Sequence, residues 1–153
     1  MATYAANTTV DAGKSRADIE RTLTRFGADS FAYGWQGTSA MVGFTAHGRQ
    51  IRFVLPMPDR TATEFTRTPT GRSRSATEAE KAYEQAVRQK WRALLLIIKA
   101  KLEAVESQIV TFEEEFATHT VLPDGRTVAE HLMPAIEQSY ASGRVSPLLQ
   151  IEN

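Results

Sequence analysis

The sequence contains no cysteine among its 153 residues. This absence excludes disulfide cross-links, thiolate metal sites and cysteine nucleophiles, and it suits a reducing compartment. No apolar run approaches the roughly eighteen residues that a membrane-spanning helix needs, and the longest covers only residues 93–98. The N-terminal residues do not show the basic segment followed by an apolar segment that is typical of a signal peptide. We therefore expect a cytoplasmic protein with no membrane contact.

Catalytic and cofactor motifs are also missing from the sequence. No Gly-Lys-Ser/Thr phosphate loop follows a strand, and no serine lies in a Gly-x-Ser-x-Gly turn. The histidines His47, His119 and His131 are scattered, without the i,i+4 spacing that puts two metal ligands on one helical face. We predict no enzyme, no cofactor and no metal site. Paired carboxylates leave no linear motif, so an acid–base activity stays open at this level.

The net charge is zero because 18 basic residues balance 18 acidic residues, but the two signs are unevenly placed. Residues 44–101 hold twelve Lys or Arg against five Asp or Glu, a balance of +7. Residues 102–153 hold two against nine, a balance of −7. Such asymmetry indicates a basic surface for an anionic partner, or complementary surfaces for self-association. The two segments could equally neutralise each other's charge within one fold. A chain of this length is expected to form one domain.

Residues 75–119 carry the longest helical pattern, and neither Gly nor Pro interrupts it. Apolar residues recur every three or four positions from Tyr83 to Phe116, which keeps them on one side of an α-helix. Ser75 with Glu78 three positions later is typical of a capped helix start. The pattern predicts one long helix over about residues 76–118.

A straight helix of that length does not fit inside its own domain. It would be about 60 Å long, whereas a domain of this size is about 40 Å across. The helix must therefore break or protrude. Because β-branched residues gather near residues 107–111, we expect a break there. A protruding helix would instead pair with another subunit and form a homo-oligomer.

A shorter helix and three strands are predicted ahead of the long helix. Residues 14–26 carry apolar side chains at helical spacing, after residues 1–13, which we expect to form a loose arm or a short edge strand. Alternating runs follow at residues 30–36, 39–46 and 49–55, and His47-Gly48 between the last two is typical of a two-residue hairpin turn. These runs predict a three-stranded antiparallel meander whose apolar face the helices cover. The fold class is therefore α+β.

Two irregular segments complete the chain. Residues 56–74 form an unusually long loop, rich in Pro, Thr, Ser, Gly and Arg, which Phe65 alone can anchor. Thr127 and Glu130 form a capping pair that begins a short C-terminal helix over residues 127–142, with Pro134 bending it or lying near its start. The tail, residues 144–153, contains a Pro-Leu-Leu patch that should dock on the body or on a partner.

Basic residues in the third strand, the loop and the start of the long helix form the best candidate site. Ser and Thr are interleaved among them, which suits contacts to phosphate groups. We predict a nucleic-acid-binding surface built from Arg49, Arg52, Arg60, Arg67, Arg72, Arg74, Lys81, Arg88, Lys90 and Arg92.

Aromatic residues in the first strand bear on the same question. Phe31, Tyr33 and Trp35 alternate along that strand and would share one face of it. They could stack nucleobases if that face meets solvent. They are core residues if the face is covered. The sequence leaves both possibilities open.

The element order resembles that of two nucleic-acid-binding families. A helix, a three-stranded meander, a basic junction and a second helix are similar to the double-stranded-RNA-binding domains, with Gly71-Arg72-Ser73-Arg74 at the place of their junction. The loop and the helix are longer here, and the lysine cluster of that family is missing. A meander followed by a long helix is also similar to the single-strand-annealing recombinases of phages. Both resemblances concern topology and imply no catalytic motif.

Three longer segments, GRQIRFVLPMPDR, KWRALLLIIKAKLEAVE and VLPDGRTVAEHLMPAIE, resemble small proteins of bacteriophages and prophages. The resemblance implies a phage-derived protein in the host cytoplasm that acts in DNA metabolism or against host defence. Our leading hypothesis is a non-enzymatic accessory protein that binds DNA or RNA through the basic surface. The alternative is a protein–protein module, such as an inhibitor of a host defence complex, that uses the long helix and the C-terminal tail.

Overall fold

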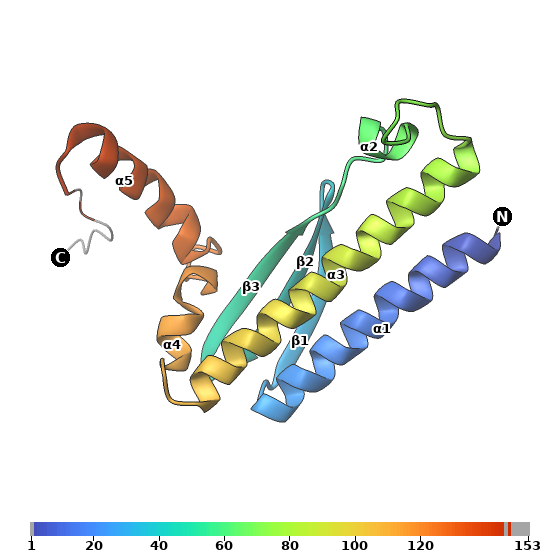
Figure 1. Cartoon of the computed structure of the whole chain (residues 1–153). Coiled ribbons are helices and arrows are strands. Elements are labelled where there is room, and N and C mark those ends of the chain that lie inside the picture. The colour runs from blue at the N-terminus through green and yellow to red at the C-terminus, as the bar shows by residue number, and fades with distance from the viewer. Residues whose placement is uncertain (1, 146, 148–153) are drawn as a thin grey trace.

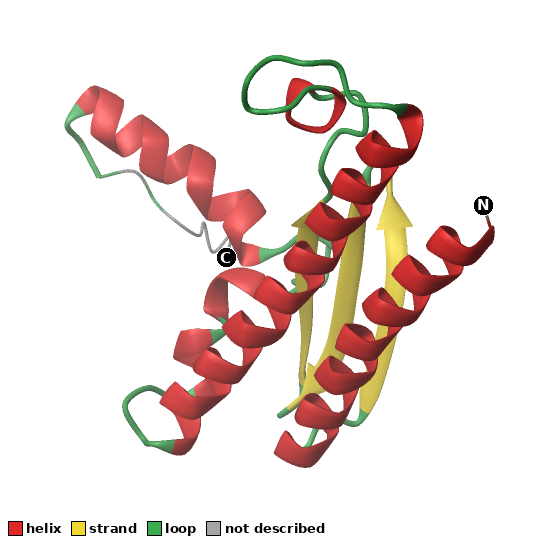
Figure 2. Cartoon of the chain, turned by 45° about the vertical axis from the view of Figure 1, so that its right-hand side comes forward, coloured by secondary structure: helices red, strands yellow, loops and turns green. Residues whose placement is uncertain are grey.

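Two helices cover one face of a three-stranded sheet, and a separate helical arm leads away from it (Figures 1 and 2). The computed structural model describes residues 2–145 and 147. The elements are α1 (Ala2–Phe26), β1 (Ser30–Gln36), β2 (Ser39–Ala46), β3 (Arg49–Pro56), α2 (Thr63–Thr66), α3 (Ala76–Glu106), α4 (Phe112–Glu115), the 3₁₀ turn η1 (Ala117–His119) and α5 (Val128–Ser142). The predicted α+β class and order of elements are thus confirmed.

The sheet is the predicted antiparallel meander, with strand order β1-β2-β3. Val42 of β2 pairs with Tyr33 of β1 and with Phe53 of β3. The β2–β3 turn places both His47 (φ 51°) and Gly48 (φ 72°) in the left-handed region, as a two-residue turn of this kind requires. This turn keeps the alternation of the two strands in phase, so their apolar residues face the same side.

The core lies between that side of the sheet and the helices. Ile19 and Leu23 of α1 are fully buried, as is Ile98 of α3. From the sheet, the buried residues are Ala40, Val42, Phe44, Ala46, Ile51, Phe53 and Leu55. The opposite face of the sheet carries mainly small and polar side chains, together with Met41 and the half-exposed Val54.

Helix α1 is longer than the sequence indicated. We expected a loose arm or an edge strand at residues 1–13, but residues 2–13 continue the helix. The prediction was based on the polar composition of that segment and was wrong. The segment also contains four alanines and no proline, and this composition favours a helix. The predicted end is correct. Gly27, at φ 117°, and Ala28 donate to the carbonyls of Thr24 and Leu23, which closes the last turn.

Helix α3 ends at Glu106, which corrects the predicted end near residue 118 and confirms the expected break near residues 107–111. The N–H of Gln108 donates to Val105 O at 3.0 Å, and that of Ile109 donates to Ala104 O at 3.1 Å. These two bonds form a Schellman motif. Gln108 adopts φ 61°, the left-handed conformation that glycine usually supplies there.

After the break the chain folds back on the core instead of protruding. The single-turn helix α4 and η1 place Phe112 and Phe116 in the core, and Phe116 is fully buried. The ring of Phe116 lies 4.8 Å from that of Phe112, 5.9 Å from Phe44 and 6.2 Å from Phe53. In the sequence, these two phenylalanines continue the apolar spacing of α3. In the structure, they pack on the core after the chain has reversed its direction.

The segment after η1 closes the outer edge of β3. Thr120 forms an isolated antiparallel bridge with Ile51, and the N–H of Val121 donates to Gln50 O at 2.8 Å. Helix α5 then begins at the predicted cap, where Thr127 Oγ1 accepts from the N–H of Glu130. Among the described residues, no helix is both long and apolar enough to cross a membrane.

Proline 134 lies inside α5 and cannot donate to the carbonyl of Glu130, four positions earlier. Arg126 takes that place, because its Nη2 donates to Glu130 O at 3.4 Å. A side-chain donor therefore satisfies the carbonyl that the proline leaves open. The Leu148-Leu149 part of the tail, which we expected to dock, lies outside the described residues.

The long loop contains one short helix and one turn. Phe65 of α2 is buried, and its ring lies 5.7 Å from that of Tyr83 of α3. Arg67 and Ser73 form an isolated bridge that closes the rest of the loop. The prediction that Phe65 anchors this segment is thus confirmed, and the loop lies at the N-terminal end of α3 (Figure 1).

Candidate nucleic-acid interface

A groove of about 380 Å³ lies between α1 and α3, near the N-terminal half of α3. Its lining residues are Lys14 and Ser15 of α1 and Gln85, Arg88, Gln89 and Arg92 of α3. Every charged residue among these described lining residues is basic, and the others carry an amide or a hydroxyl group. We call this site the basic groove. Its side chains are of the kinds that contact phosphate oxygens in nucleic-acid complexes.

Helical spacing brings these residues to one side. Gln85, Arg88 and Arg92 lie at i, i+3 and i+7, so they share one stripe along α3. Trp91 faces the core and is only 3% exposed, which fixes the rotation of α3 about its own axis. The packing of Trp91 therefore directs Arg88 and Arg92 to the seam with α1.

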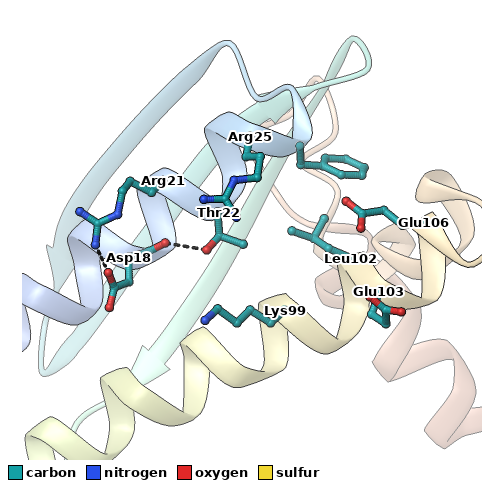
Figure 3. A pocket seen from close by; sticks show the side chains of 9 residues that line it. Asp18, Arg21, Thr22, Arg25, Lys99, Leu102, Glu103 and Glu106 are labelled. Carbon is teal, nitrogen blue, oxygen red and sulfur yellow. Dashed lines mark hydrogen bonds and ion pairs between the residues drawn. The ribbon is translucent and has the colours of Figure 1, made fainter.

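The same seam continues into a second groove of about 460 Å³, which is drawn in Figure 3. We call it the mixed groove, because Asp18, Arg21, Thr22, Arg25, Phe26, Lys99, Leu102, Glu103 and Glu106 line it. Asp18 forms an ion pair with Arg21, and its backbone carbonyl accepts from Thr22 Oγ1 at 2.7 Å. Figure 3 also shows Glu103 and Glu106 beside Leu102 at the α3 side. With charges of both signs, this groove is a poorer match for phosphate than the basic groove.

Two of the loop arginines make contacts within the chain. The Arg60 guanidinium forms an ion pair with Glu80 and lies 4.1 Å from the centroid of the Tyr83 ring. The hydrogen bond with Glu80 raises the pKa of Arg60. Arg67 donates to the carbonyl of Gly71 at 3.2 Å. Arg60 therefore holds the loop on the start of α3, and Arg67 closes the turn within the loop.

A shallow hollow of about 390 Å³ lies on the same loop. Arg67 and Arg74 contribute to it, together with Thr63, Glu64, Thr68, Pro69 and Gly71. Arg72 is exposed nearby in sequence, at the turn that Gly71 makes with φ 88°. The loop therefore presents several arginines at the end of α3 where Lys81 also lies.

Three predicted residues do not join this surface. Arg49 lies at the start of β3, the end of the sheet away from the loop, as the chain path in Figure 1 shows. Arg52 lies on the open face of the sheet and donates to the carbonyl of Gly125 at 3.0 Å. Lys90 is two positions from both Arg88 and Arg92, and residues at that spacing point to different sides of a helix. The ten predicted residues thus do not form one continuous patch.

The aromatic row of β1 is neither fully buried nor fully open. Phe31 packs against the core, Tyr33 is 37% exposed and Trp35 is 66% exposed. The hydroxyl of Tyr33 donates to the carbonyl of Arg16, and its ring lies 6.2 Å from that of Trp91. Tyr33 is therefore an anchor between strand and helices, and Trp35 alone offers most of its ring to solvent.

Sequence reasoning missed Lys14, Ser15, Gln85 and Gln89, which complete the basic groove. A signal for Lys14 existed. Lys14, Asp18, Arg21 and Arg25 recur at i, i+4, i+7 and i+11, so they mark the polar side of the first helix. Packing of α1 against α3 brings this stripe beside Arg88. No local feature of the sequence predicts that packing.

The histidines do not gather into a metal centre. In the part of the chain that the structure describes, no group of three or more His, Asp and Glu side chains is arranged to hold a metal ion. His131 Nε2 lies 2.7 Å from Asp124 Oδ2 at the base of α5. The backbone N–H of Arg126 is the main cause of the lowered pKa of Asp124, and His131 adds to it.

Comparisons of the chain with known proteins gave no match. No protein-family model matches the chain, and neither a curated protein nor a solved structure is significantly similar to it.

Proposed function

We propose that the protein binds nucleic acid through phosphate contacts in the basic groove and along the neighbouring arginine loop. The observation that supports the proposal is the groove itself, where Lys14, Arg88 and Arg92 come together from two helices. A cluster of cationic side chains with hydroxyl and amide donors binds the phosphate backbone of a nucleic acid, whatever its base sequence. The protein would act as an accessory binder without catalysis, in line with the resemblance to phage proteins.

The groove determines which variants test the proposal. Lys14→Gln with Arg92→Gln removes two positive charges from the basic groove. Arg49→Gln with Lys90→Gln removes the same charge from positions that lie outside it. Both pairs change exposed side chains, so we expect both proteins to fold.

Fluorescence anisotropy with single-stranded DNA, duplex DNA and RNA, at low and moderate salt, measures the effect. The first pair should weaken binding to all sequences alike and reduce the salt slope by about 1.4–1.8, that is 0.7–0.9 for each lost phosphate contact. The second pair should change affinity much less. Equal losses in both pairs would exclude the groove as the site, and no salt-dependent binding to any probe would overturn the function.

A second candidate function has its own structural support in α5. This helix has no buried residue among those described, and its side chains Met133 (51%) and Tyr140 (87%) are strongly exposed. Figures 1 and 2 show it leading away from the sheet and the helix layer. An exposed arm with large apolar side chains fits the alternative of a protein–protein module, such as an inhibitor of a host defence complex.

A nuclease-treated pull-down from host lysate distinguishes this alternative. Met133→Lys with Tyr140→Lys should abolish capture of a defined protein, and Gln138→Lys with Glu137→Gln on the same helix should not. If the groove variants abolish capture and the arm variants do not, the partner is recruited through nucleic acid or through the groove, and the arm has no such role.

A further inference from the structure

The two edge strands of the sheet, β1 and β3, differ in whether another segment of the chain pairs with their outer side. The outer edge of β3 is covered at Gln50 and Ile51, because Thr120 bridges Ile51 and Val121 donates to Gln50 O. Strand β1 pairs only with β2, and among the described residues no backbone group outside β2 bonds to the backbone of residues 30–36. The outer row of N–H and C=O groups of β1 is therefore without a backbone partner within the chain.

Strand β1 has none of the features that usually protect such an edge. Its sequence, SFAYGWQ, contains no charged residue and no proline. Its register with β2 runs unbroken from Ser30 to Gln36, so no bulge turns the edge away. A regular, uncharged strand of this length is a template for another strand. Trp35 and Tyr33 add exposed aromatic surface beside it, of the kind enriched at interface centres.

We propose that the β1 edge binds β1 of a second copy of this chain, antiparallel about a two-fold axis near Tyr33, to form a continuous six-stranded sheet. This contact is of the isologous type that most homodimers use. It does not depend on nucleic-acid binding.

The side chains of β1 match themselves under this symmetry. Phe31, Tyr33 and Trp35 share one face of the strand, and Ala32 and Gly34 share the other. An axis at Tyr33 places Phe31 opposite Trp35 of the second copy, and Ala32 opposite its Gly34. Aromatic rings thus meet aromatic rings, which stabilises antiparallel pairs. Because the strand has no charge, its own copy brings no like-charge repulsion.

Gly34→Lys tests this contact without disturbing the single chain. Gly34 does not require a positive φ, and a Cβ placed there meets no atom within 4 Å. In the dimer, two lysines would lie close to the axis on the same face of the sheet. The matched control is Val54→Lys, which adds the same charge on the open face but on β3, where the wild-type side chain is 49% exposed.

Light scattering over a wide concentration range measures the mass of wild type and both variants. We expect a dimer whose dissociation constant rises at least about tenfold in Gly34→Lys and is little changed in Val54→Lys. High salt should restore part of the loss, because it screens the two lysines. Amide exchange should slow at residues 30–36 in wild type as the concentration rises.

Three results would overturn the proposal. A wild-type protein that stays monomeric at every concentration has no such contact. A dimer that tolerates Gly34→Lys uses another surface, such as the exposed Leu96 and Ile97 of the long helix. A dimer that both variants weaken equally uses the open face of the sheet and not its edge. None of these results bears on the basic groove, which the anisotropy experiment tests separately.

Discussion

The imidazole of His119 lies against the ring of Phe53, with the centroids 4.2 Å apart and the planes inclined by 31°. His119 thereby ties the turn after α4 to the middle of β3. Burial of the ring, followed by the positive charge of Lys101, lowers the pKa of His119. The folded chain therefore favours the neutral form of this histidine.

Acidification should weaken folding through this group. The pKa of His119 is lower in the folded chain than the value of about 6.5 expected in the unfolded chain. Between the two values the unfolded chain binds more protons, so the free energy of unfolding rises with pH. This contribution is complete above the unfolded pKa and falls as the pH drops below it. Urea unfolding between about pH 5 and pH 8 measures the slope.

His119→Phe keeps a ring against Phe53 and cannot be protonated, so it should remove this part of the pH dependence. His47→Phe, at an exposed histidine, should leave it in place. If the slopes of wild type and His119→Phe are equal, His119 does not carry the effect.

Trp91 should be among the most costly side chains to truncate. It is 3% exposed, and both Tyr33 and the Arg16 guanidinium lie against it. Trp91→Ala should lower the free energy of unfolding by about 3–5 kcal/mol, since it removes buried surface and leaves a cavity. Leu96→Ala, on the same helix but 56% exposed, should change it by less than about 0.5 kcal/mol. Denaturant unfolding of the two variants provides the comparison.

The end of α3 should be stabilised by a glycine at position 108. Gln108 has φ 61°, a conformation that costs a side-chain-bearing residue about 1 kcal/mol. Gln108→Gly should therefore raise the free energy of unfolding by up to that amount. Ser107→Gly, where φ is −78°, should lower it, because the added backbone freedom brings no relief of strain. A destabilised Gln108→Gly protein would mean that the side chain makes a compensating contact.

Arg52 should hold the arm in place instead of binding a ligand. Its Nη2 lies 3.0 Å from Gly125 O and 3.5 Å from Glu130 Oε1, and its Nε is buried without a hydrogen-bond partner among the described residues. Arg52→Ala should cost on the order of 1 kcal/mol and accelerate amide exchange in α5. Arg49→Ala, on the same strand but at the exposed end, should do neither. Unchanged exchange in α5 with Arg52→Ala would contradict this role.

The fold was largely predictable because its signals are local. Alternation in β2 and β3 and the His47-Gly48 turn predicted the sheet, and the spacing of Ile19 and Leu23 predicted the buried side of α1. The end of α3 was harder, since Gln108 has the backbone conformation of a glycine without being one. The break could be inferred only from length and from the cluster of β-branched residues.

The candidate site was less predictable because it depends on tertiary packing. Arg88 and Arg92 could be identified as basic residues on one helical face. Lys14 is distant in sequence and joins them only because α1 packs beside α3. Arg52 shows the converse: its charge suggested a ligand contact, and only the fold shows that its Nη2 donates to Gly125 O in the loop before α5.

The bridge between Ile51 and Thr120 also affects how the chain folds. The strands of the sheet are neighbours in sequence, so they can pair as soon as they have been synthesised, whereas the cover of β3 must wait until the whole of α3 has followed. Closing so long a loop costs entropy before any contact compensates for it. A newly made sheet therefore has two open edges during this interval, and one afterwards. Aggregation of the nascent chain should be greatest before Thr120 reaches the sheet.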